Sequence, residues 1–178
     1  MFKKIDKWKV FYALVFVTGL ILMVLGIRIY RVTVISNLIP ISIILSVGTV
    51  TYMAGRKHYH KHNKGYGIFF GLLQNTCSWG FISCYLFMAS NYYLANNEDR
   101  NLKFKIKSKS SMSGSKRRRN ERKPLVTIDY FGFEKELVFR YTDTKKVENA
   151  DEVSVRVNKG FFGFDVLDHY ETVDKTEW

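Results

Sequence analysis

Three long windows without a charged residue constrain this chain more than any other feature. Residues 10–27, 32–55 and 65–97 contain no Asp, Glu, Lys or Arg, and the windows are 18, 24 and 33 residues long. An apolar helix of about 20 residues crosses the roughly 30 Å hydrocarbon core of a bilayer. Three such helices in succession would leave a small water-soluble protein no amphipathic face. The pattern predicts three transmembrane helices, at about residues 10–30, 32–54 and 67–93.

The first window also has the basic flank of a signal peptide, because four lysines precede residue 10. Its apolar run exceeds the usual length of about 7–15 residues, and no small-x-small cleavage site follows it. Aromatic residues stand at the ends of the windows, as expected at headgroup depth. They are Trp8, Tyr30, Tyr52, Tyr66, Tyr92 and Tyr93. We therefore expect an uncleaved first span.

The charges divide the chain into three segments. Residues 1–97 carry ten Lys/Arg and one acid (+9), residues 98–123 carry eleven and three (+8), and residues 124–178 carry seven and twelve (−5). We interpret these segments as a transmembrane domain, a basic stem strand with a flexible loop, and a small acidic β-domain. The expected fold is a membrane helical bundle followed by an all-β antiparallel C-terminal domain.

The tail alternates apolar and polar residues, which is typical of half-buried strands. Leu102, Phe104 and Ile106 alternate with lysines, and Val153, Val155 and Val157 form the clearest strand. Further strands are expected near residues 126–130, 136–141 and 164–170, while residues 142–151 form a polar connector of about one helical turn. The pattern predicts about five antiparallel strands.

The segment GRKHYHKHNKGYG, residues 55–67, contains three histidines that are spaced two residues apart. Between two predicted spans, its Lys and Arg residues indicate a solvated cytoplasmic loop. In an extended loop His58, His60 and His62 would share a face, so they are metal-ligand candidates. The loop contains no Cys, Asp or Glu to complete a site. The preferred interpretation is a solvated loop without metal.

Small and polar residues within the windows are candidates for helix packing. Gly67 and Gly71, and likewise Ser42 and Ser46, have the small-x-x-x-small spacing that lets helices approach closely in lipid. Packing within one chain is the simpler interpretation of both pairs. Asn75 should face another helix, because an unpaired amide in hydrocarbon is unfavourable.

Two groups in the tail are candidates for contact with a membrane surface or a partner. The first is the basic cluster of Lys116, Arg117, Arg118, Arg119, Arg122 and Lys123. Its proximity to a span favours anionic lipid headgroups over nucleic acid, which we do not expect as a partner. The second group is Phe161, Phe162 and Phe164, which suit either an exposed contact or the core and turn of a small β-domain.

The chain contains no recognisable catalytic, phosphate-binding or zinc-protease motif. We therefore expect no enzymatic activity, no cofactor and no small-molecule substrate. The preferred function is an accessory, assembly or sensory subunit whose β-domain contacts a protein at the membrane surface. An oligomeric channel or transporter subunit, or a membrane protein that protects against a toxin, are the alternatives. The partners expected are the bilayer, a protein or further copies of the chain.

The membrane orientation is nearly balanced by the positive-inside rule. With a cytoplasmic N-terminus, the flanks and loops on the cytoplasmic side carry eight Lys/Arg and those on the other side carry seven. Because the first helix usually dominates, we favour a cytoplasmic N-terminus and an external C-terminal domain in the cell membrane.

Overall fold

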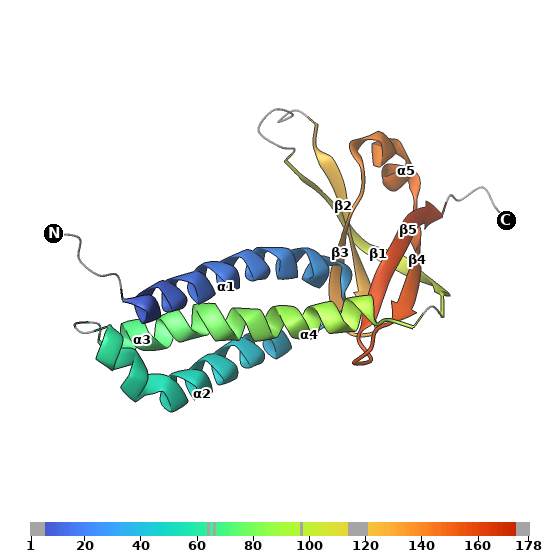
Figure 1. The fold of residues 1–178 in the computed structure, drawn as a ribbon. Coiled ribbons are helices and arrows are strands. Elements are labelled where there is room, and N and C mark those ends of the chain that lie inside the picture. Colours follow the sequence, from blue (N-terminus) through green and yellow to red (C-terminus); the bar gives the residue numbers. More distant parts are fainter. Residues whose placement is uncertain (1–5, 64, 66, 97, 114–120, 174–178) are drawn as a thin grey trace. The chain divides into compact units, whose positions relative to one another are not determined.

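The computed structural model describes residues 6–63, 65, 67–96, 98–113 and 121–173. The chain packs as two compact units, residues 1–94 and residues 95–178. The first unit is helical and the second is built on a β-sheet (Figure 1). The strand predicted as part of a separate basic stem belongs to the second unit, where it pairs with two other strands.

Two long helices open the first unit. Helix α1 spans Lys7–Val32 and helix α2 spans Leu38–His62, with residues 33–37 between them. Asp6 is the N-cap of α1, and its side chain accepts a hydrogen bond from the backbone amide of Trp8, at 3.0 Å. Both helices are long and apolar enough to cross a membrane, and few residues of their apolar windows are buried within the protein.

The third window is also helical, but it is not one regular α-helix. Helix α3 spans Ile68–Asn75, a π-helical segment spans Thr76–Gly80, and helix α4 spans Phe81–Tyr93. The segments follow one another without a gap, so the helical run extends over the whole predicted span. The π-helical segment packs against both α1 and α2. Of the three predicted spans, the first two are therefore long apolar helices that could cross a membrane, and the third is a run of shorter helical segments.

The second unit contains five antiparallel strands, as predicted. They are β1 (Arg100–Met112), β2 (Lys123–Tyr130), β3 (Phe133–Val138), β4 (Glu152–Lys159) and β5 (Asp165–Val173). Their order in the sheet is β3-β2-β1-β4-β5, with β1 in the centre. Consecutive strands β2 and β3 form one hairpin, and β4 and β5 form another.

The unit is not all-β, which corrects the prediction. A 3-10 turn at Tyr141–Asp143 leads into helix α5, Thr144–Asn149, and Val147 of α5 is buried. The helical turn expected in this polar connector is present, as the six residues of α5. α5 packs against β2.

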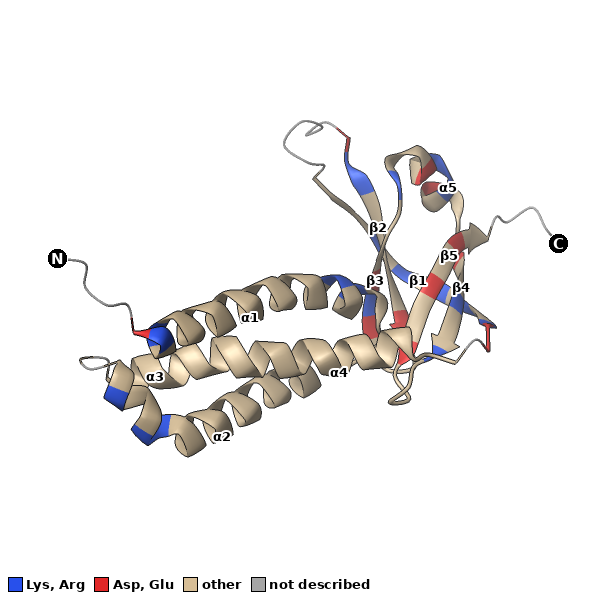
Figure 2. Cartoon of the chain, viewed as in Figure 1, with Lys and Arg blue, Asp and Glu red and all other residues tan. Residues whose placement is uncertain are grey.

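The core of the sheet comes from the alternation that the sequence contains. Val153, Val155 and Val157 of β4 are buried, which confirms the clearest predicted strand. Val126 and Ile128 of β2 are fully buried beside them. Charged residues are concentrated in the second unit. Lys, Arg, Asp and Glu occur throughout the sheet, whereas long stretches of the helices have none (Figure 2).

Candidate functional site

The histidines lie on a helix, which corrects the expectation of a loop. Helix α2 continues to His62, eight residues beyond the predicted end of the second span. Residues four apart share one face of an α-helix, whereas residues two apart point in different directions. His58 and His62 therefore face together, and His60 turns away to lie 3.1 Å from the hydroxyl of Tyr52 in the same helix. The alternating pattern that suggested a shared face applies only to an extended chain.

His58 and His62 contact the first turns of α1. Nδ1 of His58 lies 2.8 Å from the Tyr12 hydroxyl, and Nδ1 of His62 lies 2.9 Å from Oδ2 of Asp6. The Trp8 ring lies against both imidazoles, with centroid separations of 4.4 Å to His58 and 5.9 Å to His62. We call Asp6, Trp8, Tyr12, His58 and His62 the histidine clasp. It joins the start of α1 to the end of α2.

The clasp continues inward through a buried tyrosine. Tyr59 is almost completely buried, and its hydroxyl donates to Oε1 of Gln74, at 2.6 Å. Nε2 of Gln74 in turn donates to the backbone oxygen of Tyr12, at 3.5 Å. The polar groups of α1, α2 and α3 thus satisfy one another at this end of the bundle. Such a network positions the helix ends because each polar group would be unfavourable without its partner.

The histidines of the clasp lie against protein side chains. Among the residues that the structure describes, no three His, Cys, Asp or Glu side chains gather closely enough to hold a metal ion. The candidate ligands His58, His60 and His62 are each directed to a different neighbour, namely Tyr12, Tyr52 and Asp6. The clasp geometry instead suits a structural contact between helices.

The Asp6 carboxylate both caps α1 and contacts His62 of the clasp. The effect of its charge on the start of α1 can therefore be tested. Hydrogen bonds from His62 and from the Trp8 amide lower the pKa of Asp6 below its ordinary value of 3.8. A lowered folded-state pKa means that the contribution is complete above pH 3.8 and is lost as the pH falls through the lowered value. We expect Asp6→Ala to speed amide exchange in the first turn of α1, measured by hydrogen exchange and mass spectrometry. Asp6→Asn should have a smaller effect, because asparagine also caps helices. Equal exchange in all three proteins would contradict this role.

Three glycines mark close helix contacts in the first unit. A Cβ atom at Gly19 of α1 would overlap the carbonyl oxygen of Cys77 and lie 2.9 Å from Cα of Ser78. A Cβ atom at Gly48 would lie 2.6 Å from Cα of Thr76, and one at Gly80 would lie 2.5 Å from the Ile44 oxygen. All three contacts involve the π-helical segment. This segment is therefore the place where the three helical stretches approach most closely.

The predicted packing residues have different positions. Gly71 lies in a helix contact, since a Cβ atom there would be 2.6 Å from the Tyr52 ring, whereas nothing lies within 4 Å of such an atom at Gly67. Ser42 and Ser46 are exposed and donate to carbonyl oxygens of their own helix. Asn75 is buried, but its amide donates to the Gly71 oxygen of its own helix, at 2.8 Å. The spacing rule missed Gly19, Gly48 and Gly80 because it examines one helix and not the surface opposite.

In the second unit, strand β1 changes its neighbours at a bulge. Residues 100–105 pair with β4, whereas residues 106–112 pair with β2, and the register shifts between Ile106 and Ser108. Beyond Lys105, no strand in the described part of the chain pairs with β1 on its β4 side. Alternate backbone groups of residues 107–112 therefore face an open edge, although they belong to the central strand.

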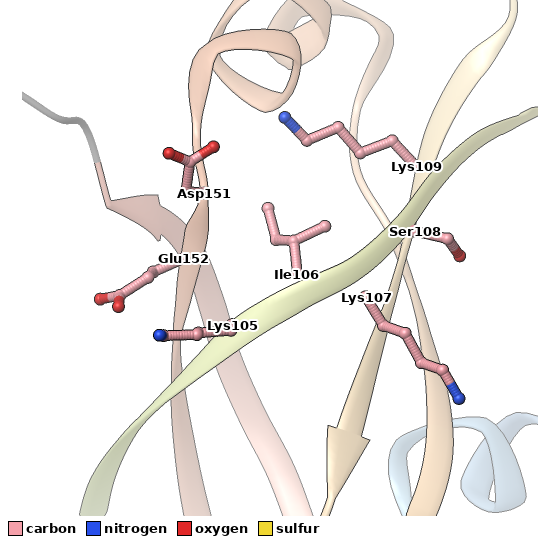
Figure 3. Close-up of a pocket in the computed structure, with 7 residues that line it drawn as sticks. All are labelled: Lys105, Ile106, Lys107, Ser108, Lys109, Asp151 and Glu152. Atoms are coloured by element: carbon pink, nitrogen blue, oxygen red, sulfur yellow. The ribbon is translucent and has the colours of Figure 1, made fainter.

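A groove follows this open edge. Its first part has a volume of about 670 Å³ and is lined by Lys105, Ile106, Lys107, Ser108, Lys109, Asp151 and Glu152. Lys105, Ile106 and Lys109 are directed to the side of Asp151 and Glu152, while Lys107 points away (Figure 3) and pairs with Glu134. Nζ of Lys109 donates to the backbone oxygen of Glu148 at the end of α5, at 2.7 Å. We call this the β1 groove.

A second hollow, of about 390 Å³, shares Lys109 with this groove. It is lined by Lys109, Ser110, Ser111, Arg122, Pro124, Thr144, Val147 and Glu148. Arg122 of the predicted basic cluster lines it, and Lys123 pairs with Met112 at the start of β2. Lys116, Arg117, Arg118 and Arg119 lie outside the described residues. Of the cluster's described residues, Arg122 therefore lies at this second hollow.

The predicted aromatic residues lie at a turn between β4 and β5. Phe161 and Phe162 are exposed and Phe164 is half-buried. Phe131 and Phe133 are also exposed, at the turn between β2 and β3, and were not among the predicted contact residues. The signal for them is the segment YFGF, residues 130–133, in which a glycine follows two aromatic residues at a hairpin turn.

Comparison with models of protein families, with curated proteins and with solved structures found no match to this chain. Its function is therefore inferred from the chemistry of the histidine clasp, the close helix contacts, the β1 groove and the aromatic turns. Of these features, the β1 groove combines an open strand edge with hollows of about 670 and 390 Å³ beside it.

Proposed function

We propose that this chain is an integral membrane protein with three spans, formed by α1, α2 and the helical run from Ile68 to Tyr93. The three proposed spans have 26, 25 and 26 residues. At about 1.5 Å per residue each is nearly 40 Å long, which exceeds the roughly 30 Å hydrocarbon core. Leu14, Val50 and Phe69 are among the many large apolar side chains exposed along these helices. Lipid is the solvent that makes such surfaces favourable.

We also propose that the β-sheet unit binds another protein at the membrane surface, as an accessory or assembly subunit does. The observation that supports this function is the open edge of β1 beside the β1 groove. An extended segment can add to such an edge through backbone hydrogen bonds, and adjacent hollows then accommodate its side chains. Central strands rarely leave half of their length unpaired, because exposed edges invite unwanted pairing. With a cytoplasmic N-terminus, the groove would face the outside of the cell.

A photo-crosslinking experiment tests this function. The full-length protein is expressed in its own cells with p-benzoylphenylalanine in place of Ser110, which lines the groove, and is irradiated in intact membranes. We expect an adduct with one different protein, identified by mass spectrometry. The same photoreactive residue in place of Lys146, which is exposed on α5, should give much less of that adduct.

Charge-matched variants decide whether the adduct depends on the groove. Lys105→Gln with Lys109→Gln should reduce it strongly, because both side chains are directed into the groove (Figure 3). Lys145→Gln with Lys146→Gln makes the same change in charge on α5 and should leave it unchanged. An adduct of twice 20.9 kDa would instead indicate a homo-oligomer and favour the channel alternative. The absence of any adduct at Ser110 would contradict a partner-binding groove.

A further inference from the structure

Two aromatic turns lie at one end of the sheet. The turn between β2 and β3 follows Tyr130, and the turn between β4 and β5 follows Lys159. Strand β1 starts at Arg100, which pairs with Val157 near the second turn, and its Phe104 ring lies 5.6 Å from the Phe131 ring of the first. Both turns therefore lie toward the N-terminal end of β1. In Figure 1 the arrowheads of β2 and β4 point to the same end of the sheet.

The two turns are also linked to each other. The Tyr130 hydroxyl donates to Oδ2 of Asp165, at 2.8 Å, across from β2 to β5. Nζ of Lys159 lies 3.6 Å from Oδ1 of the same carboxylate. Burial and the bond to Asp165 raise the pKa of Tyr130 far above its ordinary value, so the hydroxyl stays protonated and remains a donor. The residues that flank the two turns are thus joined by a hydrogen bond and an ion pair.

The rings at these turns project outward. Phe131 is 73% exposed and Phe161 is 61% exposed, with Phe133 and Phe162 beside them. Phe131 has a φ of +49° and Gly132 has a φ of +89°. Two positive φ values in a two-residue hairpin turn normally select Asn-Gly, because asparagine tolerates this conformation better than an aromatic residue. An exposed phenylalanine in this position is unfavourable for the turn in water, which points to a role outside the fold.

The connection between the last helix and the first strand is short. Helix α4 ends at Tyr93, and five residues, 95–99, separate Leu94 from Arg100. Even a fully extended chain of this length reaches only about 20 Å. If the helical run from Ile68 to Tyr93 spans the bilayer, the end of the sheet that carries the aromatic turns starts within this distance of the headgroups.

We propose that Phe131, Phe133, Phe161 and Phe162 insert into the interface of the bilayer and hold the sheet against the membrane. This inference rests on the proposed membrane location. Aromatic side chains are favoured at headgroup depth, and apolar loops bind there by burying their exposed area. The charges around the turns are mixed, since Lys103 and Lys159 stand near Asp129 and Asp165. The contact is therefore apolar and needs no anionic lipid.

Quenching of tryptophan by brominated lipid tests the insertion. Phe131→Trp and Phe161→Trp are made separately in a full-length chain that also carries Trp8→Phe, Trp79→Phe and Trp178→Phe. Met112→Trp in the same background is the matched control, because Met112 is 46% exposed at the opposite end of β1. Each protein is reconstituted in phosphatidylcholine vesicles with or without bromine on the acyl chains near the headgroups.

We expect bromine to lower the emission at positions 131 and 161 by roughly twofold, with a blue shift, and to leave position 112 nearly unchanged. Adding anionic lipid should not increase the quenching. Quenching at 131 and 161 equal to that at 112 would overturn the insertion, as would quenching that requires anionic lipid. A blue shift without quenching would mean that a second copy of the chain covers the turns, which also overturns it.

A parallel measurement separates this inference from the membrane location itself. Trp79 lies in the π-helical segment, midway along the proposed span, and is partly exposed. A chain that keeps Trp79 but carries Trp8→Phe and Trp178→Phe therefore reports on the helices alone, in vesicles whose lipids carry bromine near the ends of the acyl chains. Quenching of Trp79 without quenching at 131 and 161 would refute only the insertion of the turns. The absence of quenching at Trp79 would refute the proposed membrane location.

Discussion

Replacing Gly19 with alanine is expected to lower the free energy of unfolding of the helical unit by about 2 kcal/mol or more. The added methyl group would overlap the Cys77 carbonyl oxygen and lie 2.9 Å from Cα of Ser78. Both are backbone atoms of the π-helical segment, so no side-chain rotation can relieve the overlap. Overpacking of a well-packed contact typically costs about 1–3 kcal/mol. Unfolding by a denaturing detergent, followed by circular dichroism, measures the change.

Gly26→Ala is the matched control in the same helix. The nearest atom to a Cβ at Gly26 is Cδ2 of Tyr85, at 3.8 Å, which is an ordinary van der Waals distance. Alanine also has a higher helix propensity than glycine by about 1 kcal/mol. This control should therefore be neutral or stabilising. A Gly19→Ala protein as stable as the Gly26→Ala protein would contradict the close approach of α1 to the π-helical segment.

The helices could be predicted from the sequence because the evidence for them is local. A window without charges and longer than about 18 residues indicates a long apolar helix whatever surrounds it. The end of α2 could not be predicted in this way. His58 and His62 extend the helix into a polar segment, where their contacts with Asp6 and Tyr12 join residues more than 40 positions apart. Composition suggests a loop there, and only the tertiary contacts indicate a helix.

The candidate sites also differ in whether local sequence or tertiary contacts determine them. Gly71 has a recognisable small-x-x-x-small spacing, but the more crowded contact at Gly19 depends on the backbone of another helix. Five strands follow from alternation, whereas the β1 groove depends on the exchange of neighbours at the bulge after Ile106. A bulge leaves little trace in a single sequence, because it alters pairing and not residue type. The parts that could be predicted are therefore the elements, and the missing parts are the surfaces between them.

The second large effect is expected in the core of the sheet, at Ile128. Its side chain is fully buried, and the residue pairs with Ile106 on β1 and with Lys135 on β3. Truncation of a buried isoleucine to alanine costs about 2–5 kcal/mol. A domain of this size has a total stability of only about 4–12 kcal/mol. Ile128→Ala should therefore remove a large part of the stability of the sheet unit, with exchange of its buried amides rising by at least tenfold in hydrogen-exchange mass spectrometry.

The helical unit should be unaffected by the same substitution, since residues 1–94 and residues 95–178 are separate compact units. Val138→Ala is the matched control, because Val138 is exposed at the end of β3 and its truncation should cost less than about 1 kcal/mol. Loss of protection in α1 and α2 together with the sheet would contradict independent units. Because the β1 groove and the aromatic turns both require the sheet, Ile128→Ala should also weaken the proposed partner adduct at Ser110 and the lipid quenching at position 131. Both losses would come from the sheet unit alone, since the helical unit is unchanged.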